Sequence, residues 1–264
     1  MENINTSDDI ALSLSNIHFS YHSPLGEIKA LENITFSLKK GEFLAIVGPS
    51  GCGKSTLLNI ISGLLEPEIG KIAVFGTNSE TSSDASVIGY MLQHDHLFEW
   101  RTIYENVTLG LEIRHEFSEK NKERVLQLLD NYGLSSFIHK RPSELSGGMK
   151  QRAALIRTLA LNPQILLLDE PFSALDYQTR LMVSSDIGKI IRQSNKTAIL
   201  VTHNLSEAIS MADRVLVFSK RPSTIRKEFP IKLTITDDSL LAYRNAPEFQ
   251  SYFNEIWEVL IHES

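Results

Sequence analysis

The chain has 264 residues, of which 42% are hydrophobic and 22% charged, so it can bury the core of one large domain or two small ones. Its net charge of −6 argues against a protein that binds nucleic acid through a basic face. The single cysteine, Cys52, excludes an intrachain disulfide and fits a reducing compartment. The first residues lack the charged flank and apolar block of a signal peptide, and no apolar run approaches the about 20 residues that span a bilayer, so we expect a soluble chain.

The first third of the chain reads as strands around a glycine-rich loop. Residues 12–21 and 28–38 are predicted strands, and SPLGE is the turn between them. The continuous apolar run EFLAIVG, at 42–48, is typical of a strand buried on both faces. It leads into the loop and a helix from Lys54 to about residue 62. Two further strands are predicted at KIAVFG and VIGYMLQ.

The rest of the chain alternates between helices and buried strands. From about residue 102 to 160 the pattern is helical, with Val125, Leu128 and Leu129 at helical spacing. Three apolar strands follow, at NPQILLLDEP, KTAILVTH and ADRVLVFSK. This alternation predicts an α/β sheet core, with the helical middle inserted into it as a subdomain.

The tail after residue 221 ends in a predicted amphipathic helix. Its apolar residues Phe249, Phe253, Ile256 and Leu260 recur at i, i+4, i+7 and i+11. We expect this helix to pack on the body of the protein. A regulatory or partner-binding tail is the alternative.

The loop after the first buried strand matches a phosphate-binding pattern. GPSGCGKS fits G-x-x-x-x-G-K-[ST], in which backbone N–H groups curl around a phosphate and the following helix adds its positive end. Lys54 would reach the β- and γ-phosphates, and the Ser55 hydroxyl would ligate Mg²⁺. A chance glycine turn is the alternative, but the position between a buried strand and a helix is the context that the motif needs. The predicted cradle is Gly48, Pro49, Ser50, Gly51, Cys52, Gly53, Lys54, Ser55 and Thr56.

A second group of candidate residues ends the strand ILLLDEP. Its two acids lie at the carboxyl end of a buried strand, where α/β sheets bind their ligands. Asp169 would hold the Mg²⁺ shell, and Glu170 would orient and polarise an attacking water. A pair of solvated strand-end acids is the alternative. Any P-loop NTPase shares these features, so they do not identify the family.

The stretch LSGGMKQ, at 145–151, followed by a strand that ends in Asp-Glu, resembles the ATP-binding cassette (ABC) ATPases. Other motifs fall in the order of that family: Gln93 lies where the family has its Q-loop glutamine, SALD matches the D-loop and ends in Asp176, and His203 matches the switch histidine. Tyr21 is placed like the aromatic residue that stacks on adenine. Taken alone, such a histidine is more often structural, such a tyrosine belongs to the core, and such a glutamine is solvated.

The resemblance runs from about residue 13 to 220. It implies a P-loop NTPase (RecA-like) core with an antiparallel β subdomain and an inserted helical subdomain. We expect an ABC ATPase domain over 10–220, with the helical subdomain at about 102–160, and a C-terminal extension over 221–264. The resemblance also implies ATP and Mg²⁺ as cofactors, Glu170, His203 and Gln93 as catalytic residues, and Ser55, Gln93 and Asp169 as metal ligands.

By the same resemblance, two cassettes pair head to tail as a homodimer. The glycine loop of one subunit and the LSGGMKQ stretch of the other then hold the same ATP. Ser146, Gly147 and Gly148 would face the γ-phosphate across the dimer interface, and Asp176 would join the nucleotide site. ATP binding would join the subunits, and hydrolysis would release them.

Three longer stretches, within 91–107, 157–180 and 201–225, resemble the ATPase subunits of nitrate/sulfonate/taurine-type importers, some of which take up thiamine-precursor pyrimidines. This implies integral-membrane permease subunits as partners, indirectly a solute-binding protein, and a peripheral position on the cytoplasmic face of the cell membrane. Residues 93–105 would form the face that contacts the permease. Two residues depart from the family: Asn204 replaces the usual Asp, and Glu99 replaces a common Pro before Trp100.

Three alternatives to an importer subunit remain. An exporter or lipoprotein-release ATPase is the nearest, separated only by the subgroup resemblance. A cassette ATPase that acts on nucleic acid or ribosomes usually has coiled-coil arms, zinc cysteines or a second cassette, which this sequence lacks. A non-catalytic regulator is disfavoured because Lys54, Asp169, Glu170 and His203 are all present. We therefore expect no nucleic-acid partner.

Overall fold

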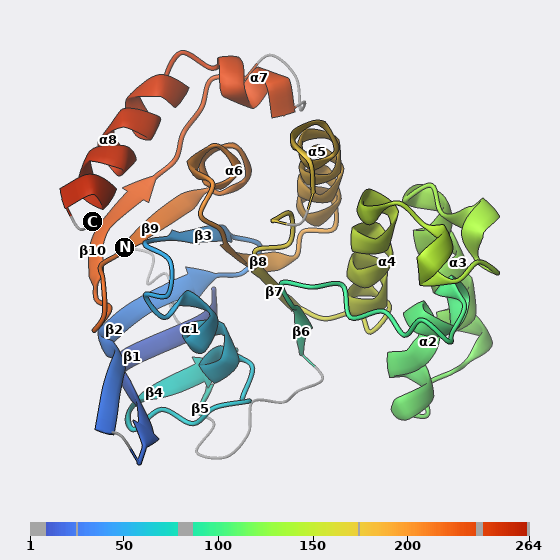
Figure 1. Cartoon of the computed structure of the whole chain (residues 1–264), viewed down its shortest axis with the longest axis horizontal. Coiled ribbons are helices and arrows are strands. Elements are labelled where there is room, and N and C mark those ends of the chain that lie inside the picture. The colour runs from blue at the N-terminus through green and yellow to red at the C-terminus, as the bar shows by residue number, and fades with distance from the viewer. Residues whose placement is uncertain (1–8, 25, 79–86, 174, 236–239, 263–264) are drawn as a thin grey trace, which may run out of the picture.

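The structure is a computed structural model that describes residues 9–24, 26–78, 87–173, 175–235 and 240–262. Leu25 of the predicted turn and Ala174 of the predicted D-loop lie outside these residues. Figure 1 shows a small sheet at the lower left, a larger sheet beside it, and a separate group of helices on the right.

The small sheet is antiparallel. It contains β1 (Ile10–Ser23), β2 (Gly26–Lys39), β4 (Ile69–Val74) and β5 (Thr77–Asn78), in the order β2-β1-β4-β5. Side chains that face inward from the first two strands, such as Leu12, Leu14 and Ile34, are buried. The strands predicted at 12–21 and 28–38 are confirmed and extend further at both ends. The strand predicted at 71–76 instead runs over residues 69–74.

The larger sheet is parallel except at one edge. It contains, in spatial order, β10 (Ile225–Pro230), β9 (Arg214–Phe218), β3 (Phe43–Val47), β8 (Thr197–Val201), β7 (Ile165–Asp169) and β6 (Ile88–Met91). Only β10 runs antiparallel to its neighbour. The sequence predicted the other five strands, although not their exact ends, and did not predict β10.

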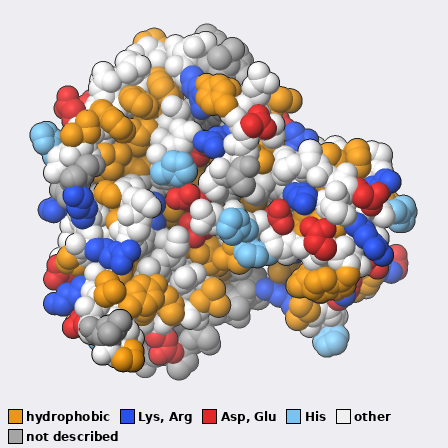
Figure 2. Space-filling view, viewed as in Figure 1, with side chains coloured by type: hydrophobic (Ala, Val, Ile, Leu, Met, Phe, Trp, Pro, Cys, Tyr) orange, Lys and Arg blue, Asp and Glu red, His pale blue; other side chains and the backbone are white. Residues whose placement is uncertain are grey.

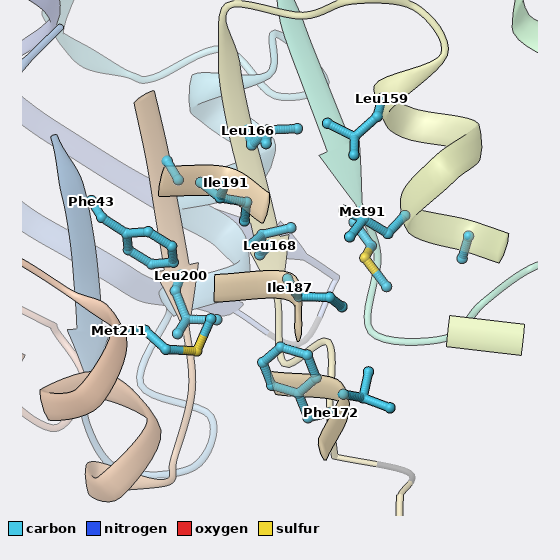
Figure 3. Packing of buried hydrophobic residues seen from close by; sticks show 14 of the residues in the cluster. Phe43, Met91, Leu159, Leu166, Leu168, Phe172, Ile187, Ile191, Leu200 and Met211 are labelled. Carbon is cyan, nitrogen blue, oxygen red and sulfur yellow. The ribbon is translucent and has the colours of Figure 1, made fainter. Parts of the chain in front are cut away.

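Helices cover both faces of the larger sheet, which explains why every residue of β3, β7 and β8 is buried. Between the two sheets lies α1 (Lys54–Ile61), whose Leu57 and Leu58 enter one core. On the opposite face lie α5 (Tyr177–Gln193) and α6 (Leu205–Met211), which close a second core (Figure 3). In that core Leu168 and Leu200 of the sheet pack among side chains from these helices. The predicted α/β architecture is confirmed.

The separate group of helices is built from residues within the predicted helical segment. It contains α2 (Ile103–Ile113), α3 (Glu119–Asn131), two short 3₁₀ turns at Ser135–Phe137 and Pro142–Glu144, and α4 (Gly147–Leu159). The side chains of Ile103, Val107 and Leu111 line one face of α2 and are fully buried, as are Val125 and Leu129 of α3. Helix α4 contacts both α2 and β6, so it connects this group to the larger sheet.

The tail forms α7 (Leu240–Asn245) and α8 (Phe249–His262). The predicted amphipathic helix is confirmed, because Phe249 and Ile256 are buried in the second core and Phe253 and Leu260 pack against it. Figure 1 shows α8 beside β10 and α6, at the upper left. Within the described ranges, no helix combines the length and the apolar character that crossing a membrane requires.

Candidate functional site

The glycine-rich loop lies between the end of β3 and the start of α1, as predicted. Gly53 has φ of +120°, and a Cβ there would lie 3.1 Å from the Ala30 carbonyl oxygen, so the loop needs glycine at this position. Lys54 is only 5% exposed, and its Nζ donates to the Gly48 and Pro49 carbonyl oxygens at 2.9 and 3.0 Å. These bonds hold the ammonium group inside the curl of the loop, where a phosphate would bind.

A pocket of about 360 Å³ opens in front of this loop. Its lining comes from six separate parts of the chain, and consists of Tyr21, Ala30, Ser50, Gly51, Cys52, Gly53, Lys54, Ser55, Thr56, Gln93, Glu170 and Arg221. The Tyr21 hydroxyl bonds the Thr56 hydroxyl at 3.0 Å, which fixes the aromatic ring at the edge of the pocket. The ring is 42% exposed, so it is accessible for stacking with a planar ligand.

Asp169 ends β7 beside the loop and has a buried carboxylate. The Tyr90 hydroxyl donates to its Oδ2 at 3.4 Å, whereas Oδ1 is buried and has no hydrogen-bond partner within the described ranges. Burial raises the pKa of Asp169, an effect that the neighbouring Ser55 hydroxyl opposes. A buried, unpaired carboxylate oxygen beside a serine hydroxyl fits a bound Mg²⁺, which usually takes one or two carboxylates together with substrate phosphates.

Three predicted residues come together at the carboxyl edge of the larger sheet. Glu170 follows β7, His203 follows β8, and Gln93 follows β6. The Glu170 Oε2 lies 3.1 Å from His203 Nδ1 and 3.5 Å from Gln93 Nε2. Glu170 has φ of +45°, a strained backbone conformation that is common at functional positions. The arrangement places the Glu170 carboxylate, which lines the pocket, between a donating amide nitrogen of Gln93 and a ring nitrogen of His203.

The departure at Asn204 has a structural explanation. Its side-chain oxygen caps α6 by accepting the backbone N–H groups of Ser206 and Glu207, and its Nδ2 donates to Glu207 Oε1 at 3.2 Å. Glu207 is only 3% exposed, its Oε2 accepts from the Thr202 hydroxyl at 2.7 Å, and burial raises its pKa. An Asp at position 204 would place a second carboxylate next to the buried carboxyl group of Glu207, where Asn204 instead donates a hydrogen bond. Sequence reasoning missed Glu207, because nothing in its immediate sequence marks it as buried.

The predicted signature residues lie elsewhere in the chain. Ser146 caps α4, and its Oγ accepts from the Met149 backbone at 3.4 Å. Gly147 is exposed and Gly148 is buried. Asp176 caps α5, where hydrogen bonds from Thr179 lower its pKa. None of these four residues lines the pocket at the glycine loop, and Figure 1 shows α4 on the far side of β6 and β7 from α1.

The segment after Gln93 is fastened to α4 by an arginine that sequence reasoning missed. Arg157 donates to the Asp95 and His96 carbonyl oxygens at 2.6 and 2.7 Å. Its pKa is lowered by burial. The other departure, Glu99, forms an ion pair with Lys150 of α4 at 3.7 Å. The segment therefore contacts the signature helix at two points.

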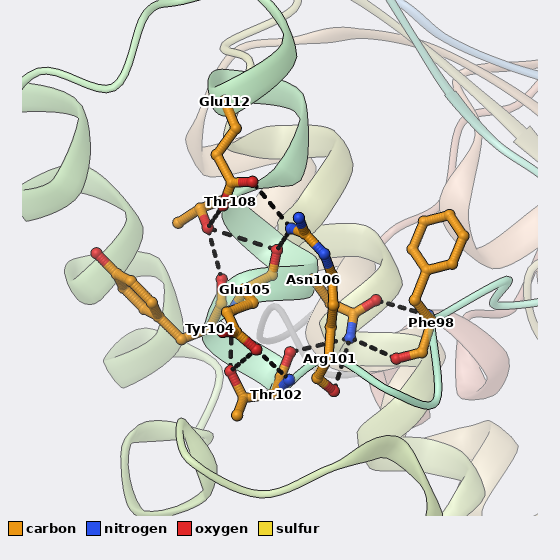
Figure 4. A network of polar contacts seen from close by, with 8 residues as sticks. All are labelled: Phe98, Arg101, Thr102, Tyr104, Glu105, Asn106, Thr108 and Glu112. Atoms are coloured by element: carbon orange, nitrogen blue, oxygen red, sulfur yellow. Dashed lines mark hydrogen bonds and ion pairs between the residues drawn. The ribbon is translucent and has the colours of Figure 1, made fainter.

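The aromatic residues of this segment are held by a polar network at the start of α2 (Figure 4). The buried Asn106 accepts from the Phe98 backbone N–H at 2.7 Å, and its Nδ2 donates to the carbonyl oxygens of Phe98, Arg101 and Thr102. The rings of Phe98 and Trp100 lie 4.8 Å apart, and Trp100 is 70% exposed. An exposed aromatic on a braced turn is typical of a partner-binding surface.

The chain is similar to known proteins both in sequence and in fold. The family described as ABC transporter matches residues 31–173. The chain is 45% identical to the ABC transporter ATP-binding protein YtlC of Bacillus subtilis, over 94% of this chain and 95% of that one. It is 41% identical to the taurine import ATP-binding protein TauB of Pelagibacter ubique, over 91% of each chain. Among solved structures, the chain resembles the dimeric ATP-binding cassette MJ0796 bound to ADP and Pi, with a TM-score of 0.73, 31% identity, and 84% of this chain and 99% of that one covered.

Proposed function

The chain belongs to the ABC transporter family as an ATP-hydrolysing subunit, and we propose that it works as a homodimer that drives uptake of a small solute. The solute would be an anion of the nitrate, sulfonate or taurine type, or a thiamine-precursor pyrimidine. The partners would be permease subunits in the membrane, which hold the chain at its cytoplasmic face, and indirectly a solute-binding protein. Residues 10–220 would form the ATPase domain, with about 102–160 as its helical subdomain, and 221–264 the extension.

We assign the nucleotide site to the pocket at the glycine loop. Lys54 meets the β- and γ-phosphates, Tyr21 stacks on adenine, and the loop amides of 48–56 surround the phosphates. Mg²⁺, when bound, neutralises charge on the β- and γ-phosphates. Its protein ligands would be Ser55, Gln93 and Asp169. The unpaired Oδ1 of Asp169 supports this assignment.

Glu170 is the proposed general base. Its Oε2 accepts a proton from the attacking water, while the contacts with His203 and Gln93 hold the carboxylate toward the pocket. In this proposal the Nδ1 of His203 carries a proton and donates it in a hydrogen bond to the Glu170 carboxylate. His203 therefore positions the base and leaves the removal of the water proton to Glu170. The backbone bond from Glu170 N to the Val201 carbonyl oxygen, at 2.8 Å, fixes the residue relative to β8.

The observation that supports a dimer is the position of the predicted signature residues. Ser146, Gly147, Gly148 and Asp176 do not line the pocket of their own chain. The exposed Gly147, at the positive end of α4, remains available for an anion on another molecule. A two-fold pairing would bring the start of α4 from one subunit to the γ-phosphate held by the other, and so complete two sites. The solved cassette that this chain resembles is itself dimeric.

The import direction rests on the name of a relative at 41% identity. The nearest alternative is an exporter or lipoprotein-release ATPase. A distant alternative is an ATPase that acts on nucleic acid or ribosomes. Among the described residues on the face in Figure 2, Lys and Arg side chains are scattered among acidic and neutral ones. That distribution gives a phosphate backbone no continuous basic strip on this face.

The test replaces the native chain by Lys54→Ala in its source cell and measures uptake of labelled taurine, an alkyl sulfonate, nitrate and a thiamine-precursor pyrimidine. Lys120→Ala is the control, because Lys120 is exposed on α3, away from the pocket. We expect Lys54→Ala to abolish uptake of one class of solute. If the Lys54→Ala strain takes up all four solutes normally but fails to release a solute or lipoproteins from the cell membrane, the result would instead favour the exporter.

A further inference from the structure

The segment between β9 and β10, residues 219–224, contacts both sides of the nucleotide pocket. We call it the clasp. Ser223 is fully buried, its backbone N–H donates to the Ala30 carbonyl oxygen at 3.0 Å, and its own carbonyl accepts from Glu32 at 2.9 Å. Its hydroxyl donates to the Cys52 carbonyl oxygen in the glycine loop. The clasp therefore ties the loop to β2, the strand that pairs with the one carrying Tyr21.

The clasp is itself held in shape by Ser219. The Ser219 hydroxyl accepts from the Thr224 backbone N–H at 2.9 Å and donates to the Lys220 carbonyl oxygen at 2.9 Å. These bonds close the turn on which Arg221 stands. Arg221 Nε donates to the Gly51 carbonyl oxygen, so the guanidinium group is fixed against the glycine loop.

Arg221 also lines the pocket, together with Lys54 and Ser55. Its side chain is exposed, and it forms no ion pair with a carboxylate in the part of the chain that the structure describes. A hypothetical Cβ on Gly51 would lie 3.0 Å from Arg221 Nη2, which shows how closely the far end of the guanidinium approaches the loop. Because Nε is the atom bonded to Gly51, the Nη donors stay available at the pocket.

We propose that Arg221 is a nucleotide-binding residue whose guanidinium pairs with the phosphate chain of bound ATP. An arginine suits this position because its planar fork can donate to a carbonyl through Nε and to phosphate oxygens through Nη at the same time. Lysine, with one nitrogen at the tip of a flexible chain, cannot span both partners in this way. The inference rests on the assignment of the glycine loop as the phosphate site under the proposed function.

The test measures equilibrium binding of ATP, ADP and adenosine to the full chain, in the Glu170→Gln background so that ATP stays intact. Arg221→Gln removes the charge but keeps a planar amide. We expect its affinity for ATP to fall about 10- to 100-fold, the worth of one hydrogen bond to a charged group, while adenosine binds as before. ATP binding should also weaken less steeply with added salt. Arg221→Lys should recover part of the ATP affinity, and Lys120→Gln, which removes a distant charge, should change nothing.

Two results would overturn the inference. One is an Arg221→Gln protein that binds ATP like its parent, and the other is an equal loss for ATP and adenosine with unchanged salt dependence, which is what a purely structural role predicts. A parallel Lys54→Ala measurement separates this failure from that of the proposed function. If Lys54→Ala loses ATP and Arg221→Gln does not, only the inference about Arg221 fails. If Lys54→Ala binds ATP normally, the glycine-loop assignment itself is wrong.

Discussion

Replacing each signature glycine by alanine separates packing within the chain from contact across a dimer. A Cβ on Gly148 would lie 2.7 Å from Thr179 Cγ2 and 3.3 Å from Val183 Cγ2, both on α5. A Cβ on Gly147 would meet only Leu175 Cδ2, at 3.5 Å, which is an ordinary van der Waals contact. Packing within the chain therefore does not require a glycine at position 147. At position 148 it does, because the missing side chain lets α4 and α5 pack closely.

The magnitudes differ accordingly. Gly148→Ala forces Thr179 or the two helices to shift, and such overpacking costs about 1–3 kcal/mol of unfolding free energy. The better helix propensity of alanine offsets up to about 1 kcal/mol of this loss. Each kcal/mol lowers Tm by about 2–4 °C in a chain of this size. Gly147→Ala meets no such clash, so its Tm should equal or slightly exceed that of the wild type.

Activity should follow a different order from stability. If Gly147 faces the γ-phosphate of ATP held by a partner subunit, an added methyl group there blocks close approach of the helix start. Gly147→Ala should then fold normally yet lose ATP-dependent dimerisation and most ATP hydrolysis. The assays are thermal unfolding without nucleotide, ATPase rate, and size-exclusion chromatography with ATP in the Glu170→Gln background.

A double variant tests the steric explanation for Gly148. Thr179→Ser removes the clashing Cγ2 and keeps the hydroxyl that bonds Asp176. Gly148→Ala combined with Thr179→Ser should therefore recover Tm beyond the sum of the single effects. Additive losses would refute the packing argument. A Gly147→Ala protein that hydrolyses ATP at the wild-type rate would refute the contact across the dimer.

Four further predictions follow from the site. Glu170→Gln should stop hydrolysis while ATP binding persists and an ATP-bound dimer accumulates; normal turnover would move the base elsewhere, with His203 next to be tested. Trp100→Ala should uncouple transport but spare the ATPase activity of the isolated subunit, and loss of solubility instead would mean that Trp100 packs in the subdomain. Burial raises the pKa of Glu207, so as pH rises the carboxyl group loses its proton in the unfolded state before it does so in the folded state. The free energy of unfolding should therefore fall as pH rises from 4.5 through the raised pKa, and Glu207→Gln should remove this part of the pH dependence. Mixing Lys54→Ala with Ser146→Arg, each inactive alone, should restore up to about a quarter of wild-type activity for independent sites in a two-fold dimer, whereas zero activity in demonstrably mixed, ATP-bound dimers would count against sites shared between subunits.

The sequence predicted where the catalytic candidates lie because their positions follow from strand order. Glu170 comes directly after β7, Gln93 and His203 come two residues after the ends of β6 and β8, and the carboxyl ends of parallel strands share one edge of a sheet. Continuous apolar runs in the sequence indicated that these strands are buried on both faces. Strand order therefore explains why three residues that lie far apart in sequence meet, whereas the choice of Gln93 and His203 came from the resemblance to the ABC ATPases.

The sequence could not predict contacts that depend on how distant segments pack. Arg221 bonds Gly51, which is 170 positions away, and no local pattern marks either residue for the other. Arg157 and Glu207 were missed for the same reason, since an arginine in a helix and a glutamate near a helix start usually face solvent. β10 escaped prediction because only Phe229 among its six residues is buried, so its apolar pattern is weak.

The packing of α4 explains how a nucleotide at one subunit could be sensed at a partner-binding surface. Lys150 and Arg157 are seven positions apart on this helix, two turns along one face, and both hold the segment after Gln93. The same helix begins at the signature residues Ser146 and Gly147. If ATP draws that end of α4 toward a neighbouring subunit, we expect residues 95–99 to move with it, because two hydrogen bonds and an ion pair connect them to the helix. Trp100 follows directly in the sequence, so closure of the nucleotide site would displace the aromatic surface proposed to contact a permease.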